Sequence, residues 1–103
     1  MAPSDIRIHP NAKFVYSANR GDDSVAVFNI DEGTGRLTRV EIVKTGGQGP
    51  REMNIEPSAK FLFVCNLQSN DVTTFALDGN TGKMTQVSKL SVPRAAVIDF
   101  ATL

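Results

Sequence analysis

The sequence predicts an all-β fold made of two copies of one four-stranded antiparallel unit. The first observation is a gap-free internal repeat at an offset of 47 residues, which aligns Pro10 with Pro57 and Phe14 with Phe61. The second is a turn signal about every 8–12 residues, with no helical periodicity between the turns. Internal repeats of this length indicate stacked or radial units rather than one ordinary core.

Each unit is expected to hold four short strands separated by polar turns. In the first unit, residues 9–13, 20–23 and 31–35 are rich in Pro, Asn, Asp and Gly, which favour turns. The segments between these turns are rich in β-branched and aromatic residues or alternate polar with apolar ones. The fourth segment has a mixed pattern that suits an outer strand. The expected strands are 5–8, 14–19, 24–30 and 37–44, then 52–55, 61–66, 71–77 and 84–90.

A four-stranded repeat of about 40–50 residues is typical of a β-propeller blade. We expect one blade in residues 1–48, a second in 49–92, and the first strand of a further blade in 93–103, where Pro93-Arg94 repeats Pro50-Arg51. Two blades cannot close a ring, and the outer edges would stay uncovered. The chain is therefore expected to be a piece of a longer propeller or to form a homo-oligomer by head-to-tail association.

Composition excludes several classes of partner. Eleven Lys and Arg residues balance eleven Asp and Glu residues, so no basic field favours nucleic acid or an anionic membrane. No apolar run reaches the roughly 20 residues of a membrane span. The first residues have neither the basic nor the apolar region of a signal peptide, and Cys65 alone cannot form an intrachain disulfide. These features favour a cytoplasmic location.

Three segments carry a family resemblance. Residues 14–21 (FVYSANRG), 23–28 (DSVAVF) and 49–51 (GPR) resemble the C-terminal part of the seven-bladed β-propeller lactonases, which include 6-phosphogluconolactonases and 3-carboxymuconate lactonizing enzymes. The resemblance covers nearly the whole chain but only two blades of seven. It implies a cofactor-free lactone hydrolase or cycloisomerase type of protein, acting on an anionic sugar or muconate lactone once further blades are present.

Some positions depart from the family pattern. Ala12 and Ala59 stand where the family usually has Gly, Asp22 where it often has His, and Leu67 where it has Gln. The departures at Asp22 and Leu67 favour an alternative function, a non-catalytic propeller module for protein contacts or assembly.

The candidate site follows from the geometry of a meander. Alternate turns lie at opposite ends of a blade, a strand length of about 17–20 Å apart. The turn 20–23 therefore shares an end with the junction 46–51, so Arg20 and Arg51 can converge, whereas His9 lies at the other end. Their repeat equivalents are Leu67 and Ser4, so the blade itself does not require arginine at either position.

Arginines beside glycine-rich turns suit carboxylate or phosphate groups. By resemblance, Arg51 and Arg20 would hold an anionic lactone and stabilise charge on its carbonyl oxygen. Asp22 or Glu52 could take part in proton transfer if burial raises its pKa. The expected substrate-binding residues are Gly49, Asn19 and Gln48.

Structural explanations compete with these roles. Asp22 can serve turn chemistry, because Asp side chains bind their own backbone. Glu52 is the repeat equivalent of Asp5, which favours a structural role. His9 is expected at the surface, and Cys65 as a small buried residue. No His/Cys cluster supports zinc; a metal-dependent lactonase of the six-bladed kind would need a cluster such as Asn19, Asn66 and Asp22.

Overall fold

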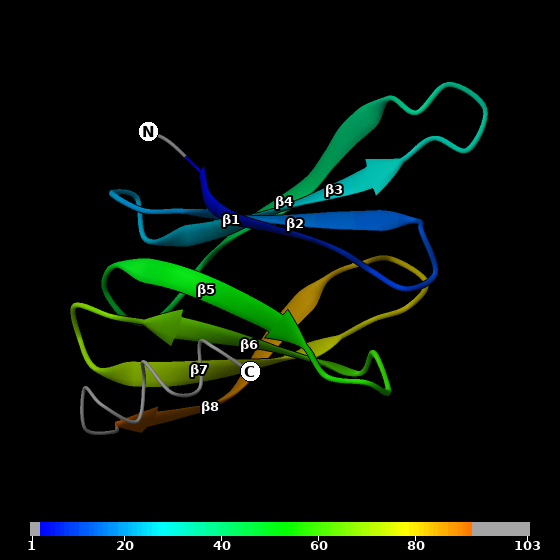
Figure 1. Cartoon of the computed structure of the whole chain (residues 1–103). Helices are drawn as coiled ribbons and strands as arrows, with labels where there is room; N and C mark the ends of the chain where they lie inside the picture. The colour runs from blue at the N-terminus through cyan, green and yellow to red at the C-terminus, as the bar shows by residue number, and fades with distance from the viewer. Residues whose placement is uncertain (1–2, 92–103) are drawn as a thin grey trace.

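The computed structural model describes residues 3–91, with side chains from residue 5 onwards. Within this range the chain forms two four-stranded antiparallel sheets and no helix (Figure 1). No helix in residues 3–91 is therefore long and apolar enough to cross a membrane. The strand expected in 93–103 lies outside the described residues. The strands are β1 (Pro3–Ile8), β2 (Phe14–Asn19), β3 (Ser24–Ile30), β4 (Leu37–Lys44), β5 (Pro50–Ile55), β6 (Phe61–Asn66), β7 (Asp71–Leu77) and β8 (Met84–Ser91).

Both sheets are meanders in chain order, β1-β2-β3-β4 and β5-β6-β7-β8, which confirms the predicted fold class. β1 and β5 begin two residues earlier than expected, and β8 ends one residue later. The repeat extends to irregularities in strand pairing. The register shifts between Pro3 and Asp5 in β1, and between Pro50 and Glu52 in β5, so Ser4 and Arg51 occupy equivalent β-bulges.

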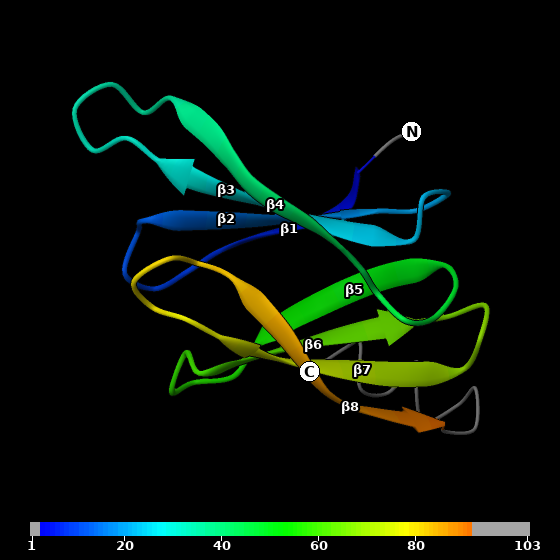
Figure 2. The same ribbon diagram turned by 180° about the vertical axis from the view of Figure 1, so that it is seen from behind.

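The hydrophobic core lies between the two sheets rather than inside either one. β1 and β5 run side by side at one edge of this pair (Figures 1 and 2). Because side chains alternate between the faces of a strand, each sheet sends every second residue into the contact. The buried cluster is Phe14, Tyr16, Ala18, Val25 and Val27 from the first sheet, and Met53, Leu62, Val64, Phe75 and Met84 from the second.

Polar groups also join the two sheets. The Oδ2 atom of Asp5 accepts the backbone N–H of Met53 at 2.7 Å, and Nε of Arg7 donates to the Met53 carbonyl at 2.8 Å. At the far side of the contact, the hydroxyl of Tyr16 donates to the Gly82 carbonyl at 3.0 Å. These bonds fix the register of one blade against the next.

His9 is buried, with 6% of its surface exposed, so the expectation of a surface residue is wrong. The turn after β1 folds back, and the His9 ring packs edge-on against Phe14 with centroids 6.2 Å apart. Its Nδ1 atom accepts the backbone N–H of Asn11 at 3.1 Å. The histidine therefore stabilises the turn at the end of the blades away from Arg20. Cys65 is buried in β6, as expected.

Candidate functional site

The end of the sheets that carries Arg20 and Arg51 is built from three segments, the turn 20–23, the loop 45–49 and the turn 67–70. We refer to it as the junction end, since the loop 45–49 joins the two sheets there. It lies on the left in Figure 1 and on the right in Figure 2. The segments are far apart in sequence, yet hydrogen bonds connect all three.

Asp23 ties the first sheet to the junction loop. Its carbonyl oxygen accepts the N–H of Thr45 at 2.9 Å, and its Oδ1 atom accepts the N–H of Gly49 at 3.0 Å. Asp23 has a positive φ of 54°, as does its repeat equivalent Asn70, and Asp and Asn are among the residues that adopt this conformation most readily. Sequence reasoning treated Asp23 only as turn chemistry and missed this bond to the junction loop.

Gly49 connects the same loop to the second sheet. Its carbonyl accepts the N–H of Leu67 at 2.9 Å, and φ at Gly49 is +68°, a conformation that favours glycine. A Cβ at Gly49 would also lie 2.6 Å from Cγ of Gln68. Both backbone polar groups of Gly49 therefore have protein partners, so its requirement for glycine is explained without a ligand.

Beneath the loop lies a buried polar cluster that the sequence did not single out. Nδ2 of Asn66 donates to Oδ1 of Asp71 at 2.8 Å and to Oγ1 of Thr73 at 3.0 Å. Gly47 packs directly on this cluster, since a Cβ there would lie 2.4 Å from the same Oδ1 and 2.5 Å from the same Nδ2. The recurrence of Asn at 19 and 66 was the only sequence signal for it.

Asp22 is half-buried and its carboxylate has two partners. Oδ2 accepts the hydroxyl of Ser24 at 2.7 Å, and Oδ1 lies 3.1 Å from Nζ of Lys44. The Ser24 hydrogen bond, followed by the contact with Lys44, lowers the pKa of Asp22. The raised pKa that proton transfer by Asp22 required is therefore absent, and the carboxylate is ionised at neutral pH.

Arg20 and Arg51 are both exposed at the junction end. Neither guanidinium has a hydrogen bond or an ion pair within the part of the chain that the structure describes. Arg51 occupies the β-bulge at the start of β5, and bulges re-aim side chains and occur next to active sites. Among the residues that the structure describes, these are two cations without a bonding partner.

The remaining predicted site residues, Gln48, Asn19 and Glu52, differ from one another in exposure and in hydrogen bonding. Gln48 is exposed, and its backbone N–H donates to Oγ of Ser69 at 2.8 Å. Asn19 is half-buried at the end of β2, where its backbone pairs with Pro3. Glu52 is half-buried on β5, at the position equivalent to Asp5.

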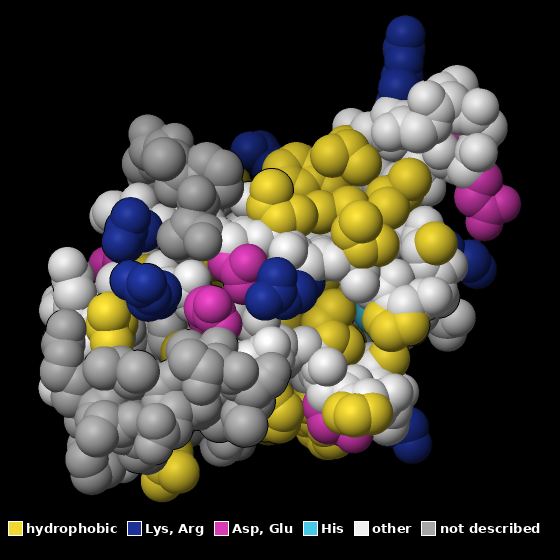
Figure 3. Space-filling model, viewed as in Figure 1, with side chains coloured by type: hydrophobic (Ala, Val, Ile, Leu, Met, Phe, Trp, Pro, Cys, Tyr) yellow, Lys and Arg dark blue, Asp and Glu magenta, His cyan; other side chains and the backbone are white. Residues whose placement is uncertain are grey.

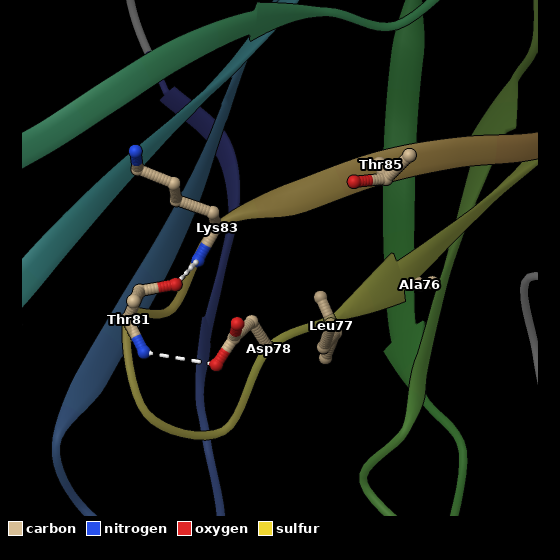
Figure 4. Close-up of a pocket in the computed structure, with 6 residues that line it drawn as sticks. All are labelled: Ala76, Leu77, Asp78, Thr81, Lys83 and Thr85. Carbon is tan, nitrogen blue, oxygen red and sulfur yellow. Dashed lines mark hydrogen bonds between the residues drawn. The ribbon is translucent and has the colours of Figure 1, made fainter.

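A cavity of about 680 Å³ lies at the opposite end, in the β7–β8 hairpin (Figure 4). There, Oδ1 of Asp78 accepts the backbone N–H groups of Asn80 and Thr81, and these hydrogen bonds lower the pKa of Asp78. The Lys83 ammonium points away from the Asp78 carboxylate. Asp31 makes the same turn in the first sheet, so this is a blade feature rather than a catalytic arrangement. Within residues 3–91, no three His, Cys, Asp or Glu side chains are grouped to hold a metal ion.

Two adjacent four-stranded meanders with a shared core define propeller blades. The family model described as "Lactonase, 7-bladed beta-propeller" matches residues 1–100, and the chain belongs to this family.

Three relatives illustrate the similarity. The 6-phosphogluconolactonase of Bacillus subtilis (strain 168) is 48% identical over 48 residues, which is 47% of this chain and 14% of that protein. A solved protein from Lactobacillus plantarum superimposes with a TM-score of 0.84 at 32% identity, over 88% of this chain and 27% of that one. The periplasmic gluconolactonase of Pseudomonas aeruginosa gives 0.83 at 28% identity, over 88% and 26%. The chain thus spans about a quarter of the length of the solved proteins it matches.

Proposed function

We propose that the chain forms part of a lactone-hydrolysing propeller whose substrate is an anionic sugar lactone, with the anionic group bound at the junction end. Lactone hydrolysis is the activity that the family suggests, and one relative is named a 6-phosphogluconolactonase. The observation that carries the proposal is Arg51, an exposed guanidinium in a β-bulge with no partner among the described residues.

The chemistry of the substrate explains why such a cation is useful. When water attacks a lactone carbonyl, its oxygen gains negative charge before the ring C–O bond breaks. A guanidinium can stabilise that charge, or it can hold a carboxylate or phosphate elsewhere on the substrate through two parallel hydrogen bonds. Arg51 and Arg20 are assigned these roles together, since both lie at the junction end.

The two carboxylates are assigned to the scaffold rather than to proton transfer. Asp22 is occupied by Ser24 and Lys44. Glu52 corresponds to Asp5, which binds the backbone of the neighbouring blade. Gln48 and Asn19 stay in the proposal as neutral groups near the anion.

The proposal is tested by measuring hydrolysis of 6-phosphogluconolactone by this chain together with the further blades that complete its propeller. The spontaneous rate of hydrolysis is subtracted. Arg51→Ala should lower kcat/KM by about 10- to 100-fold, the equivalent of one charge-assisted hydrogen bond. Arg51→Lys should recover only part of the loss, because an ammonium lacks the planar fork. Arg39→Ala is the matched control, since Arg39 is exposed on the outer strand β4.

Two outcomes would contradict the proposal. No turnover by the assembled protein would leave the alternative of a non-catalytic module for protein contacts. Equal losses for Arg51→Ala and Arg39→Ala would remove Arg51 from the site.

A further inference from the structure

Asp23 links the two segments that carry the candidate arginines. Arg20 precedes Asp23 by three positions in the turn 20–23, and Arg51 follows Gly49 by two positions. Oδ1 of Asp23 accepts the backbone N–H of Gly49 at 3.0 Å. This bond crosses from the first sheet to the residue before β5 in the second sheet. It is therefore a short connection between the backbones that carry the two arginines.

Asp23 also holds the loop 45–49 at both of its ends. Its backbone carbonyl accepts the N–H of Thr45 at 2.9 Å, while its carboxylate accepts the N–H of Gly49. Gly49 is fixed from the other side as well, because its carbonyl accepts the N–H of Leu67 in the second sheet. The loop thus has a defined position relative to both sheets, and the side-chain bond of Asp23 is the part of this arrangement that a substitution can remove.

The conformation of the turn does not depend on this side-chain bond. Asn70, the repeat equivalent of Asp23, has the same φ of 54°. Oδ1 of Asn70 nevertheless has no hydrogen-bond partner in the part of the chain that the structure describes. The neighbouring Asp22 does not compete for the loop, since its carboxylate is bound to Ser24 and Lys44. The bond from Asp23 to the loop is therefore additional to what the turn of a blade requires.

The spacing of the two guanidinium groups depends on the backbones that carry them. Arg20 and Arg51 are both exposed, and neither guanidinium has a hydrogen bond or an ion pair among the described residues. Figure 3 shows Lys and Arg side chains at the surface of the junction end, on the left of the view. Two cations bind one substrate molecule together only when their spacing matches it, and a misplacement of about 1 Å can cost a factor of about 100 in rate.

We propose that Asp23 is a positioning residue of the candidate site, whose bond to Gly49 sets the spacing between Arg20 and Arg51 so that both bind the same substrate molecule. The inference rests on the proposed function, because it requires that the two arginines bind the lactone. Asp23 is assigned no contact with the substrate. It acts through the backbone of the loop 45–49.

Three variants of this chain, together with the further blades that complete its propeller, test the role in lactone hydrolysis. Asp23→Gly removes the carboxylate and keeps a residue suited to the positive φ, and kcat/KM should fall about 10-fold. Asp23→Asn keeps both the Oδ1 acceptor and the tolerance of a positive φ, so kcat/KM should stay within about two-fold of the wild type. Asn70→Gly is the matched control at the same φ, and it should leave kcat/KM unchanged.

The Arg51→Ala background separates positioning from a general structural effect. Substitutions that remove parts of one arrangement do not add, so Asp23→Gly should lower kcat/KM by about two-fold or less in this background. The physical reason is that no pair of arginines remains to be spaced. Losses of the same size in both backgrounds would overturn the proposal. Equal losses for Asp23→Asn and Asp23→Gly would also overturn it, because they would assign the effect to the charge of Asp23.

Hydrogen exchange measures the loop independently of activity. The Gly49 amide should exchange faster in Asp23→Gly than in the wild type, whereas the amides of β2 and β6 should keep their protection. Unchanged exchange at Gly49 would overturn the proposal. Lost protection in the strands would do the same, since Asp23 would then hold the whole fold rather than the loop.

Failure of the proposed function has a different signature. Arg51→Ala would then be as active as Arg39→Ala, and Asp23 would lose its assigned role along with Arg51. If Arg51→Ala instead loses activity while Asp23→Gly keeps that of the wild type, only the positioning role of Asp23 is overturned.

Discussion

The carboxylate of Asp5 binds the backbone N–H of Met53 across the contact between the two blades, at 2.7 Å. The same carboxylate lies 2.9 Å from Nη1 of Arg7, whose Nε atom binds the carbonyl of Met53. The side chains of Asp5 and Arg7 thus bind both backbone polar groups of Met53, which lies on strand β5 of the neighbouring blade. The bond is largely shielded, since 14% of the Asp5 side chain is exposed.

Asp5→Ala should destabilise the chain by about 1–3 kcal/mol, because it leaves the Met53 N–H without its acceptor and removes the anion beside Arg7. The midpoint of urea unfolding should fall with little change in the slope. Glu32→Ala is the matched control, since Glu32 is exposed in a turn. A loss no larger than that of the control would show that the bond contributes nothing to stability.

Gly47 should tolerate no side chain. A Cβ there would collide with the carboxylate of Asp71 and the amide of Asn66, both buried. Gly47→Ala should therefore cost about 1–3 kcal/mol, as overpacking does. Gly79→Ala provides the control, because no atom outside Gly79 and its two chain neighbours lies within 4 Å of a Cβ at that position. It should be neutral or stabilise by up to about 1 kcal/mol. Equal effects of the two substitutions would contradict the close packing at Gly47.

Turn chemistry made the strands predictable. Each strand boundary is marked locally by Pro, Gly, Asn or Asp, so the expected and observed strands differ by at most two residues. The order of the strands also predicted that Arg20 and Arg51 lie at the same end, because successive turns of a meander alternate between its two ends.

Contacts between distant segments were not predictable in this way. The bond from Gly49 to Asp23 spans 26 residues, and nothing in the local sequence of either turn specifies its partner. The burial of His9 was missed for the same reason, since it depends on how the turn folds onto Phe14. The direction of the pKa shift of Asp22 could not be predicted from the sequence, because it depends on the positions of Ser24 and Lys44 around the carboxylate.

Removal of the Ser24 hydroxyl should raise the pKa of Asp22 towards its ordinary value. That hydroxyl is the first cause of the lowered pKa, and Lys44 is the second. A lowered pKa in the folded state means that the contribution of Asp22 to stability is present above its unfolded pKa and is lost as pH falls through the folded pKa. Carboxyl chemical shifts followed over an acid titration measure the change in Ser24→Ala. The pKa of Asp31, lowered by the backbone N–H groups of Thr34 and Gly33, should not move. An unchanged Asp22 titration would contradict the assignment.

Tyr16 gives the chain a stability limit at alkaline pH. Burial, together with the charges of Glu41 and Asp78, raises the pKa of Tyr16 from 10.0 to about 12. The folded state therefore holds the phenol proton more tightly than the unfolded state. Its contribution to stability is fully present below pH 10 and is lost as pH rises towards 12.

Absorbance of tyrosinate measures this directly, because Tyr16 is the only tyrosine and the chain has no tryptophan. The native protein should titrate well above the unfolded protein in denaturant. Tyr16→Phe should lose about 1 kcal/mol at neutral pH with the hydrogen bond to Gly82, and its stability should fall less between pH 10 and 12. A native titration at the unfolded value would refute the burial of the phenol.

Ala12 and Ala59 place the same strain in both blades. Their φ angles are +61° and +62°, a region that costs a residue with a Cβ about 1–2 kcal/mol. Ala12→Gly and Ala59→Gly should each stabilise the chain by about 0.5–1 kcal/mol, since relief of strain outweighs the added freedom of the unfolded chain. Ala76→Gly in β7 should destabilise the chain, because no positive φ is relieved there and a glycine inside a strand weakens it. Thermal unfolding of these three variants, and of the double variant with Ala12→Gly and Ala59→Gly, compares the effects. The two sites lie in separate turns, so their gains should add; a loss of stability at either alanine would show that the turn conformation carries no strain.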